Sequence, residues 1–197
     1  MSKLALDFLI HHHSAFKNIY DSFGAPPDWR REANFATLIH IILEQQVSLA
    51  SALAAFNKLK ETLDPITPES FLNLSDEQLK KAYFSRQKMR YGRELAKSVV
   101  QGTLNLKGLE SLNDRDARTE LTKIIGIGRW TADIYLMMAL GREDIWPKGD
   151  VALASAAKDV FNLGQRPGQV ELETMAEAWK PYRSLSAKFL WHYYLSQ

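Results

Sequence analysis

The stretch LTKIIGIGRWTADIYLMMALGREDIWPKGD, residues 121–150, decides the fold of this chain. A helical run ends at a Gly-Ile-Gly turn at 126–128, a second helical run begins at Arg129, and that run stops before the WPKGD segment at 146–150. Glycine ends helices and permits positive φ, so the pattern predicts two helices joined by a tight hairpin. Asp150 closes the stretch and precedes a further helical run, 151–161.

The predicted hairpin is a candidate phosphate site. Both of its glycines can take positive φ and bring backbone close to a partner. The first N–H groups of the second helix have no helical acceptor and lie at the positive end of its dipole. These features suit a nucleic-acid phosphate held without regard to base sequence by Gly126, Ile127, Gly128, Arg129 and Thr131. An ordinary helix-turn-helix connection would show the same local pattern.

The hairpin and the WPKGD segment together resemble a known family. LTKIIGIGRWTA (121–132) followed by WPKGD (146–150) resembles the helix-hairpin-helix plus Gly/Pro-Asp motif of the DNA glycosylase superfamily. IILEQQVSLASA (41–52) is similar to the family's helix with a DNA-inserting tip. WKPYRSLSAKFLWHYY (179–194) is similar to the closing segment of the alkylpurine (3-methyladenine) branch, so the resemblance covers nearly the whole chain.

An all-α fold is predicted, because no segment alternates apolar and polar residues with the period of a strand. The resemblance implies two helical lobes with a DNA- and base-binding cleft between them. One lobe would combine residues 1–34 with 115–197, and the other would be the contiguous segment 35–114. Within that segment the helical pattern breaks at 46–48, where Ser48 can cap the next helix.

Asp150 is the candidate catalytic residue. Aspartate is a preferred N-cap, so capping of the run 151–161 already explains its position. The two roles are compatible, because a helix N-terminus stabilises an ionised carboxylate. Cleavage of a deoxyribosyl N-glycosidic bond builds positive charge on the sugar, which such a carboxylate stabilises while it orients or deprotonates the attacking water.

Further DNA contacts are expected at a wedge and at two lysines. The resemblance places the DNA-inserting tip at Gln46 and Val47, where a side chain can fill the gap left by an extruded base. Lys88 and Lys148 are candidate phosphate contacts. Without the resemblance, adjacent glutamines and charged helix exteriors are commonly just solvated.

Three tryptophans are candidate walls of a base pocket: Trp130, Trp191 and Trp29. Chemistry on a base requires its extrusion from the stack. N-alkylated purines such as 3-methyladenine and 7-methylguanine are cationic, so they leave without a general acid and gain cation–π attraction over a tryptophan face. Trp179, Tyr182 and Tyr193 are secondary candidates. An anchoring role in the core explains each tryptophan comparably well.

The predicted function is that of a monofunctional DNA repair glycosylase that removes alkylated purines from duplex DNA and leaves an abasic site. In the resembling family, members with lyase activity carry a lysine where this chain has Trp130. One alternative is a helix-hairpin-helix glycosylase for a deaminated or oxidised base. Another is a DNA-binding module without chemistry, which would need the hairpin but not Asp150.

Composition limits the remaining possibilities. The 197 residues, 46% of them hydrophobic, suffice for one sizeable domain or two small lobes. Zero cysteines exclude disulfides, thiolate metal sites and the four-cysteine iron–sulfur loop of some relatives. The consecutive His11, His12 and His13 point in different directions, so no metal site is predicted and no cofactor is required, although the resemblance allows a monovalent cation at the hairpin.

Charge and hydropathy point to the compartment. A formal net charge of +2 means that any DNA footprint must be a local concentration of Lys and Arg. No apolar run approaches the roughly 18 residues of a membrane span. We therefore expect a cytoplasmic, nucleoid-associated monomer that acts on duplex DNA and not at a membrane.

Overall fold

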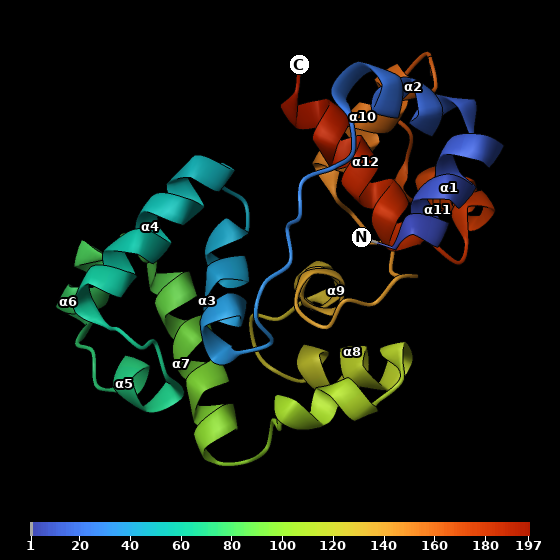
Figure 1. The fold of residues 1–197 in the computed structure, drawn as a ribbon. Helices are drawn as coiled ribbons and strands as arrows, with labels where there is room; N and C mark the ends of the chain where they lie inside the picture. The colour runs from blue at the N-terminus through green and yellow to red at the C-terminus, as the bar shows by residue number, and fades with distance from the viewer. Residues whose placement is uncertain (1) are drawn as a thin grey trace. The chain divides into compact units, whose positions relative to one another are not determined.

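The computed structural model describes residues 2–197, and every regular element within that range is a helix. The predicted all-α fold is confirmed. The chain divides into two compact units, of which one contains the residues up to Arg30 together with Gly141–Gln197 and the other contains Arg31–Leu140 (Figure 1). None of the helices in residues 2–197 has both the length and the apolar character needed to cross a bilayer.

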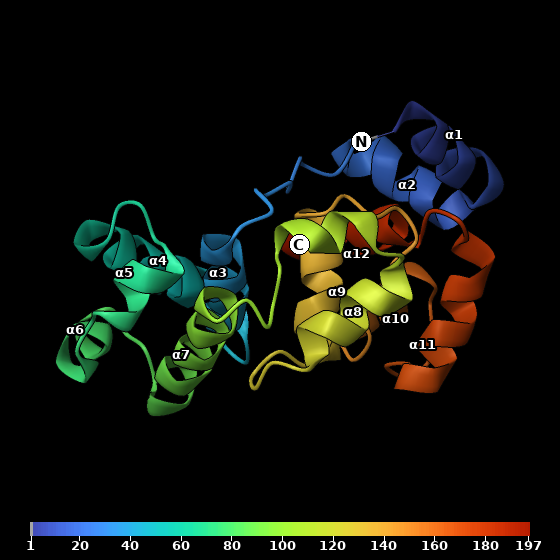
Figure 2. The same cartoon turned by 90° about the horizontal axis from the view of Figure 1, so that it is seen from below.

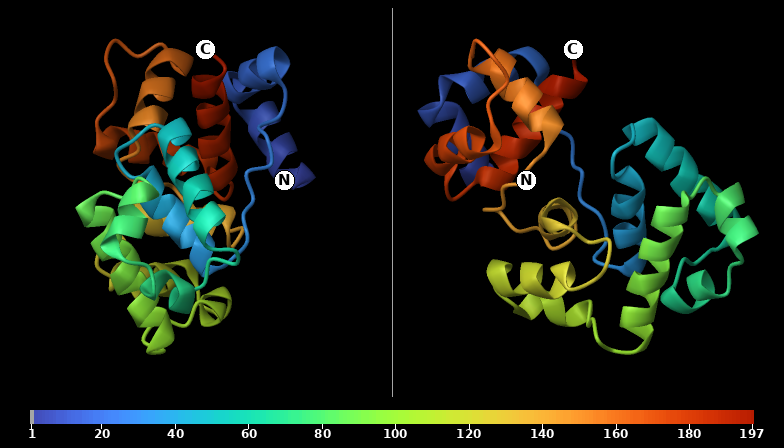
Figure 3. Two further views of the ribbon diagram at one scale, coloured as in Figure 1. Left: turned by 90° about the vertical axis from the view of Figure 1, so that its left-hand side faces the viewer. Right: turned by 180° about the vertical axis from the view of Figure 1, so that it is seen from behind.

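The unit formed by the two ends of the chain is built around its last helix, α12. Its elements are α1 (Lys3–His12), α2 (Ser14–Phe23), α10 (Val151–Val160), α11 (Gln169–Ala176), the short 3-10 helix η2 (Glu177–Trp179) and α12 (Arg183–Leu195). Helix α12 packs against α1, α2 and α10, and Figure 3 shows it running beside α10. The ring of Phe16 lies 5.2 Å from that of Trp179 and 5.7 Å from that of Phe189. These rings belong to the core of the unit.

The second unit is centred on α3 (Phe35–Glu44). Leu38, Ile39, Ile41 and Ile42 are fully buried, and eight of the ten residues of α3 are buried, so the helix lies inside this unit. It packs against α4, α7 and α9. The other elements of the unit are α4 (Leu49–Thr62), α5 (Pro68–Leu72), α6 (Asp76–Lys81), α7 (Arg86–Val100), the 3-10 helix η1 (Lys107–Ser111), α8 (Asp114–Thr122) and α9 (Arg129–Met138).

The boundary between the units differs from the division expected from the sequence. Residues 115–197 are expected to join the N-terminal segment, whereas α8 and α9 belong to the unit of α3. Helix α9 is buried from Thr131 to Met138 and packs along α3, so it shares the core of the middle segment. A helix with so little exposed surface carries no local signal of which core it joins.

His40 couples the stability of this unit to pH. Its ring stacks on Phe56 of α4, with centroids 4.3 Å apart and planes inclined by 3°. Burial lowers the pKa of His40, the Glu44 carboxylate 3.7 Å away opposes that shift, and the cations Arg31 and Lys60 add to it. A base with a lowered folded pKa binds its proton more tightly in the unfolded chain. Its contribution to stability is therefore full above its unfolded pKa of 6.5 and is lost as the pH falls toward the folded pKa.

We expect His40→Gln to flatten the loss of stability between about pH 7.5 and about pH 5. The variant starts from a lower melting temperature because it loses the stacking on Phe56, but it has no proton to take up on unfolding. Thermal unfolding across that pH range measures the effect, with the exposed His11→Gln as control. If the melting temperatures of His40→Gln and His11→Gln fell equally between the two pH values, His40 would not carry the pH dependence.

Candidate active site

Figure 2 shows the turn that joins α8 and α9. The two glycines of this hairpin differ in conformation. Gly126 has φ +93°, and a Cβ added to it would lie 2.1 Å from Cγ of Tyr91. Gly128, the N-cap of α9, has φ −82°, so only Gly126 uses the positive φ that both glycines can take. No atom lies within 4 Å of a Cβ added to Gly128. The internal structure thus needs glycine at 126 only, and the open space at Gly128 leaves room for a partner's backbone.

The anion site expected at the hairpin stays a prediction, and the structure shows how its candidate groups lie. No side-chain hydrogen bond caps the start of α9 at Gly128. Ile127 is buried and anchors the turn. The Arg129 side chain is 55% exposed, and its Nε lies 3.5 Å from Oδ2 of the fully buried Asp133. Thr131 is only 2% exposed and its hydroxyl accepts a hydrogen bond from Gln45, so a ligand contact by Thr131 stays a prediction.

The two adjacent glutamines after α3 have different surroundings in the structure. Gln45 Nε2 donates hydrogen bonds to the Gly126 carbonyl oxygen and to Thr131 Oγ1, each at 2.9 Å. Gln46 is exposed, with φ +57°, and Val47 beside it is also exposed. Ser48 caps α4 as predicted, because its Oγ accepts the backbone N–H of Ser51. The wedge assigned to Gln46 and Val47 therefore falls on exposed residues, whereas Gln45 holds the hairpin.

Asp150 stands at the N-terminus of α10, as predicted for a cap. Its Oδ1 accepts a hydrogen bond from the Leu153 backbone N–H at 2.9 Å. The residue also lines a hollow of about 240 Å³ together with Trp146, Val151 and Arg166, among others. A carboxylate at the positive end of a helix dipole and beside open space can stabilise a developing positive charge on a bound sugar. Among residues 2–197, no three or more His, Cys, Asp or Glu side chains gather in a way that could hold a metal ion.

The predicted pocket tryptophans are all half-buried. Trp29 and Trp191 meet edge to face in the unit formed by the chain ends, with ring centroids 6.5 Å apart and planes at 75°. Trp130 lies in the first turn of α9. Trp179, a secondary candidate, is buried in the aromatic core and has no face for a ligand.

Comparison with known proteins decides the family. The model of the HhH-GPD superfamily of base excision DNA repair proteins matches residues 39–183, a range that includes Gln46, the hairpin and Asp150. The chain belongs to the HhH-GPD superfamily.

Three relatives illustrate the position of the chain within the superfamily. The putative DNA-3-methyladenine glycosylase YfjP of Bacillus subtilis is 29% identical over 196 residues, which cover 94% of this chain and 68% of the relative. The solved structure of the Schizosaccharomyces pombe 3-methyladenine DNA glycosylase in complex with abasic DNA matches with a TM-score of 0.90 and 25% identity, over 96% of this chain and 95% of that one. The solved structure of the DNA-3-methyladenine glycosidase from Bacillus halodurans matches with a TM-score of 0.76 and 30% identity, over 95% of this chain and 87% of that one.

The lysines predicted to contact phosphate in this HhH-GPD protein have internal partners. Lys88 Nζ donates to the Leu43 carbonyl oxygen at 2.7 Å, and burial lowers the pKa of Lys88. Lys148 Nζ lies 2.8 Å from Oε2 of Glu173. A phosphate contact by either lysine stays a prediction, and it would have to compete with or share these interactions.

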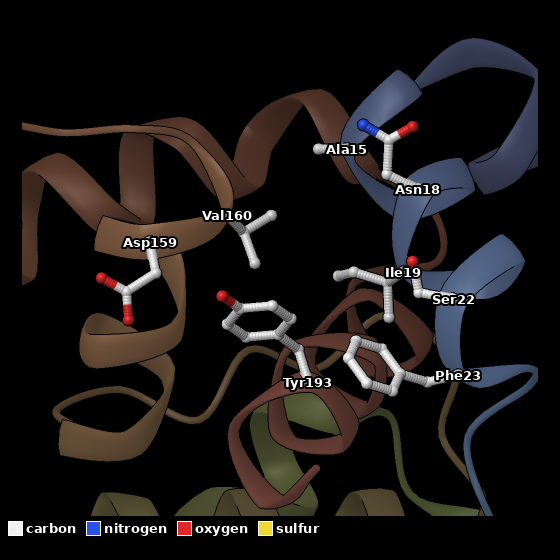
Figure 4. A pocket seen from close by; sticks show the side chains of 8 residues that line it. All are labelled: Ala15, Asn18, Ile19, Ser22, Phe23, Asp159, Val160 and Tyr193. Atoms are coloured by element: carbon white, nitrogen blue, oxygen red, sulfur yellow. The ribbon is translucent and has the colours of Figure 1, made fainter. Parts of the chain in front are cut away.

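Tyr193 belongs to a different hollow from Asp150. This second hollow, of about 170 Å³, is lined by residues of α2, the end of α10 and α12. Figure 4 shows the Tyr193 ring between Phe23 and Ile19 on one side and Val160 on the other. The two hollows share no lining residue, so Tyr193 does not form a wall beside Asp150. Tyr182, the other tyrosine among the secondary candidates, packs edge-on against Phe8 instead.

Lys188 was not singled out from the sequence, although it lies one helical turn before Trp191 on α12. Burial lowers the pKa of Lys188, the Asp28 carboxylate opposes that shift and Arg30 adds to it. A desolvated lysine gives up its proton more readily and becomes a better nucleophile. Only the tertiary structure reveals this, because a lysine in an amphipathic helix is ordinarily exposed.

Gln45→Ala should loosen the hairpin. The substitution removes two hydrogen bonds and leaves the buried Thr131 hydroxyl without its donor, at an expected loss of about 1–3 kcal/mol of stability. Affinity should fall equally for damaged and undamaged DNA, because the hairpin does not read the lesion. Chemical denaturation and DNA titration measure the two effects, with the exposed Gln46→Ala as a stability control. An unchanged unfolding midpoint in Gln45→Ala would contradict this role.

Proposed function

We propose that this chain is a monofunctional DNA glycosylase that hydrolyses the N-glycosidic bond of alkylated purines in duplex DNA. The observation that carries the proposal is Asp150, an N-cap carboxylate beside an open hollow in a member of a base excision repair superfamily. The relatives named as 3-methyladenine glycosylases support the choice of lesion.

Binding of DNA would rest on the hairpin. The uncapped start of α9, the open space at Gly128 and the exposed Arg129 suit a backbone phosphate. Such contacts carry no sequence information, which suits an enzyme that must meet lesions in any sequence. A monovalent cation at the hairpin and the monomeric state stay predictions.

Extrusion of the damaged nucleotide would be supported by Gln46. A non-glycine residue with φ +57° on an exposed turn is strained, and such residues persist where surrounding structure holds them and function uses them. The Gln46 amide has the donors and acceptors to fill the vacated position in the stack.

The chemistry would be assisted by Asp150. As the bond between C1′ and the base nitrogen breaks, its electron pair leaves with the cationic base, and positive charge develops on the sugar. The Asp150 carboxylate stabilises that charge and accepts a proton from the water that adds to C1′. A cationic base needs no general acid, and the half-buried Trp130, Trp191 and Trp29 offer π faces that favour it over a neutral base.

Base release from methylated duplex DNA tests the proposal. Free bases are separated by chromatography, and strand integrity is checked before and after heating in alkali. We expect 3-methyladenine or 7-methylguanine to be released, with nicks only after alkali. DNA binding without base release would overturn the proposal in favour of another lesion or a non-catalytic module. Nicks before alkali would contradict the absence of lyase activity, and Lys188→Ala would then show whether Lys188 is the amine responsible.

A further inference from the structure

We propose that the hollow beside Asp150 binds a DNA backbone phosphate adjacent to the target nucleotide, with Arg166 as its ligand. The inference rests on the proposed function, because it takes Asp150 to face the sugar of that nucleotide. Neither Arg166 nor the loop that carries it belongs to the motifs recognised in the sequence.

The hollow lies within one unit, between the first turn of α10 and the loop that leads into α11. Its volume is about 240 Å³. Trp146, Pro167 and Leu172 line it and are buried, so its walls are largely apolar. Asp150 and Arg166 both line this hollow. The charged groups of the lining are the Arg166 guanidinium and the carboxylates of Asp150 and Glu173, of which Glu173 is paired with Lys148. An apolar wall with an arginine matches the two parts of a nucleotide backbone, namely the C–H groups of the sugar and the phosphate.

The charges around the hollow leave Arg166 available to a ligand. Lys148 forms an ion pair with Glu173, one of the lining residues, at 2.8 Å. Oδ1 of Asp150 accepts the N–H of Leu153. The Arg166 side chain is exposed, and within residues 2–197 no carboxylate or carbonyl oxygen pairs with it. An anion entering the hollow would therefore meet the guanidinium without displacing an internal partner.

A phosphate is the anion that suits this arrangement. The planar guanidinium can donate two parallel hydrogen bonds to phosphate oxygens, a geometry that an ammonium group does not offer. In DNA a phosphate adjoins every sugar, so a sugar placed at Asp150 carries its own phosphate into the same neighbourhood. Holding that phosphate fixes C1′ relative to the carboxylate and reduces the loss of orientational entropy in the reaction.

Binding to a defined duplex tests the inference. The probe is a duplex with one tetrahydrofuran abasic-site analogue, in which single phosphates flanking the analogue are replaced in turn by neutral methylphosphonates. The variants are Arg166→Ala, Arg166→Lys and the control Lys158→Ala, which removes an equal charge from the last turn of α10. Dissociation constants are measured over a range of salt concentrations.

We expect Arg166→Ala to weaken binding about tenfold and to lower the slope of log Kd against log salt by about one, as for the loss of one phosphate contact. Arg166→Lys should restore the slope but only part of the affinity, because a lysine cannot donate the paired bonds. One methylphosphonate position should weaken the wild type and have no further effect on Arg166→Ala. Lys158→Ala should match the wild type.

The result that would overturn the inference is an Arg166→Ala variant that behaves as Lys158→Ala does, with every methylphosphonate acting equally on both. Base release from methylated DNA, measured with the same preparations, separates this failure from that of the proposed function. A wild type that releases alkylated bases while Arg166→Ala matches the control refutes the phosphate site alone. A wild type that releases no base refutes the proposed function and the inference with it.

Discussion

Asp150→Asn is expected to slow base release by about a thousandfold while leaving affinity for lesion-containing DNA within about twofold. The substitution removes the negative charge but keeps the shape of the side chain. Asparagine is also a preferred N-cap, so its Oδ1 can still accept the Leu153 N–H that Asp150 Oδ1 accepts at 2.9 Å. The variant therefore separates the charge from the cap.

Single-turnover base release, DNA titration and thermal unfolding measure this prediction together. Asp150→Ala removes both roles and should in addition lose about 1 kcal/mol of stability. The exposed Asp159→Asn, at the other end of α10, should remain fully active. Full activity in Asp150→Asn would show that the carboxylate is only a helix cap.

Gly126→Ala should cost about 3 kcal/mol of stability or more, whereas Gly128→Ala should leave stability nearly unchanged. At Gly126 an alanine would have to keep φ +93° and would drive its Cβ to 2.1 Å from the Tyr91 ring. At Gly128 the backbone is extended and the space is open. Denaturant unfolding of both variants measures the difference.

The variants Gly126→Ala and Gly128→Ala should also distinguish an effect on stability from an effect on DNA binding. Gly128→Ala places a methyl group where a phosphate would approach α9, so affinity should fall about tenfold for damaged and undamaged duplexes alike. Ser155→Ala, a small change in α10, serves as a control. A Gly128→Ala protein that binds DNA as the wild type does would show that the hairpin is an ordinary helix connection.

Much of the fold follows from local patterns in the sequence. The break at 46–48 with its Ser48 cap, the Asp150 cap of α10 and the glycine turn at 126 all depend on interactions within a few residues. Such interactions are visible in the sequence because capping side chains and positive φ select particular residue types. The superfamily followed from the same stretches, because the hairpin and Asp150 lie at fixed spacing in the chain.

Only the tertiary structure decided which residues far apart in the chain contact one another. Gln45 and Gln46 are equivalent in a sequence, yet one bonds Gly126 across 81 positions and the other is exposed. The assignment of α9 to the core of α3, the Lys88 bond to Leu43 and the sharing of one hollow by Asp150 and Arg166 are likewise long-range. Local propensity cannot specify them, because they arise from how buried surfaces pack and from the requirement that buried polar groups find partners.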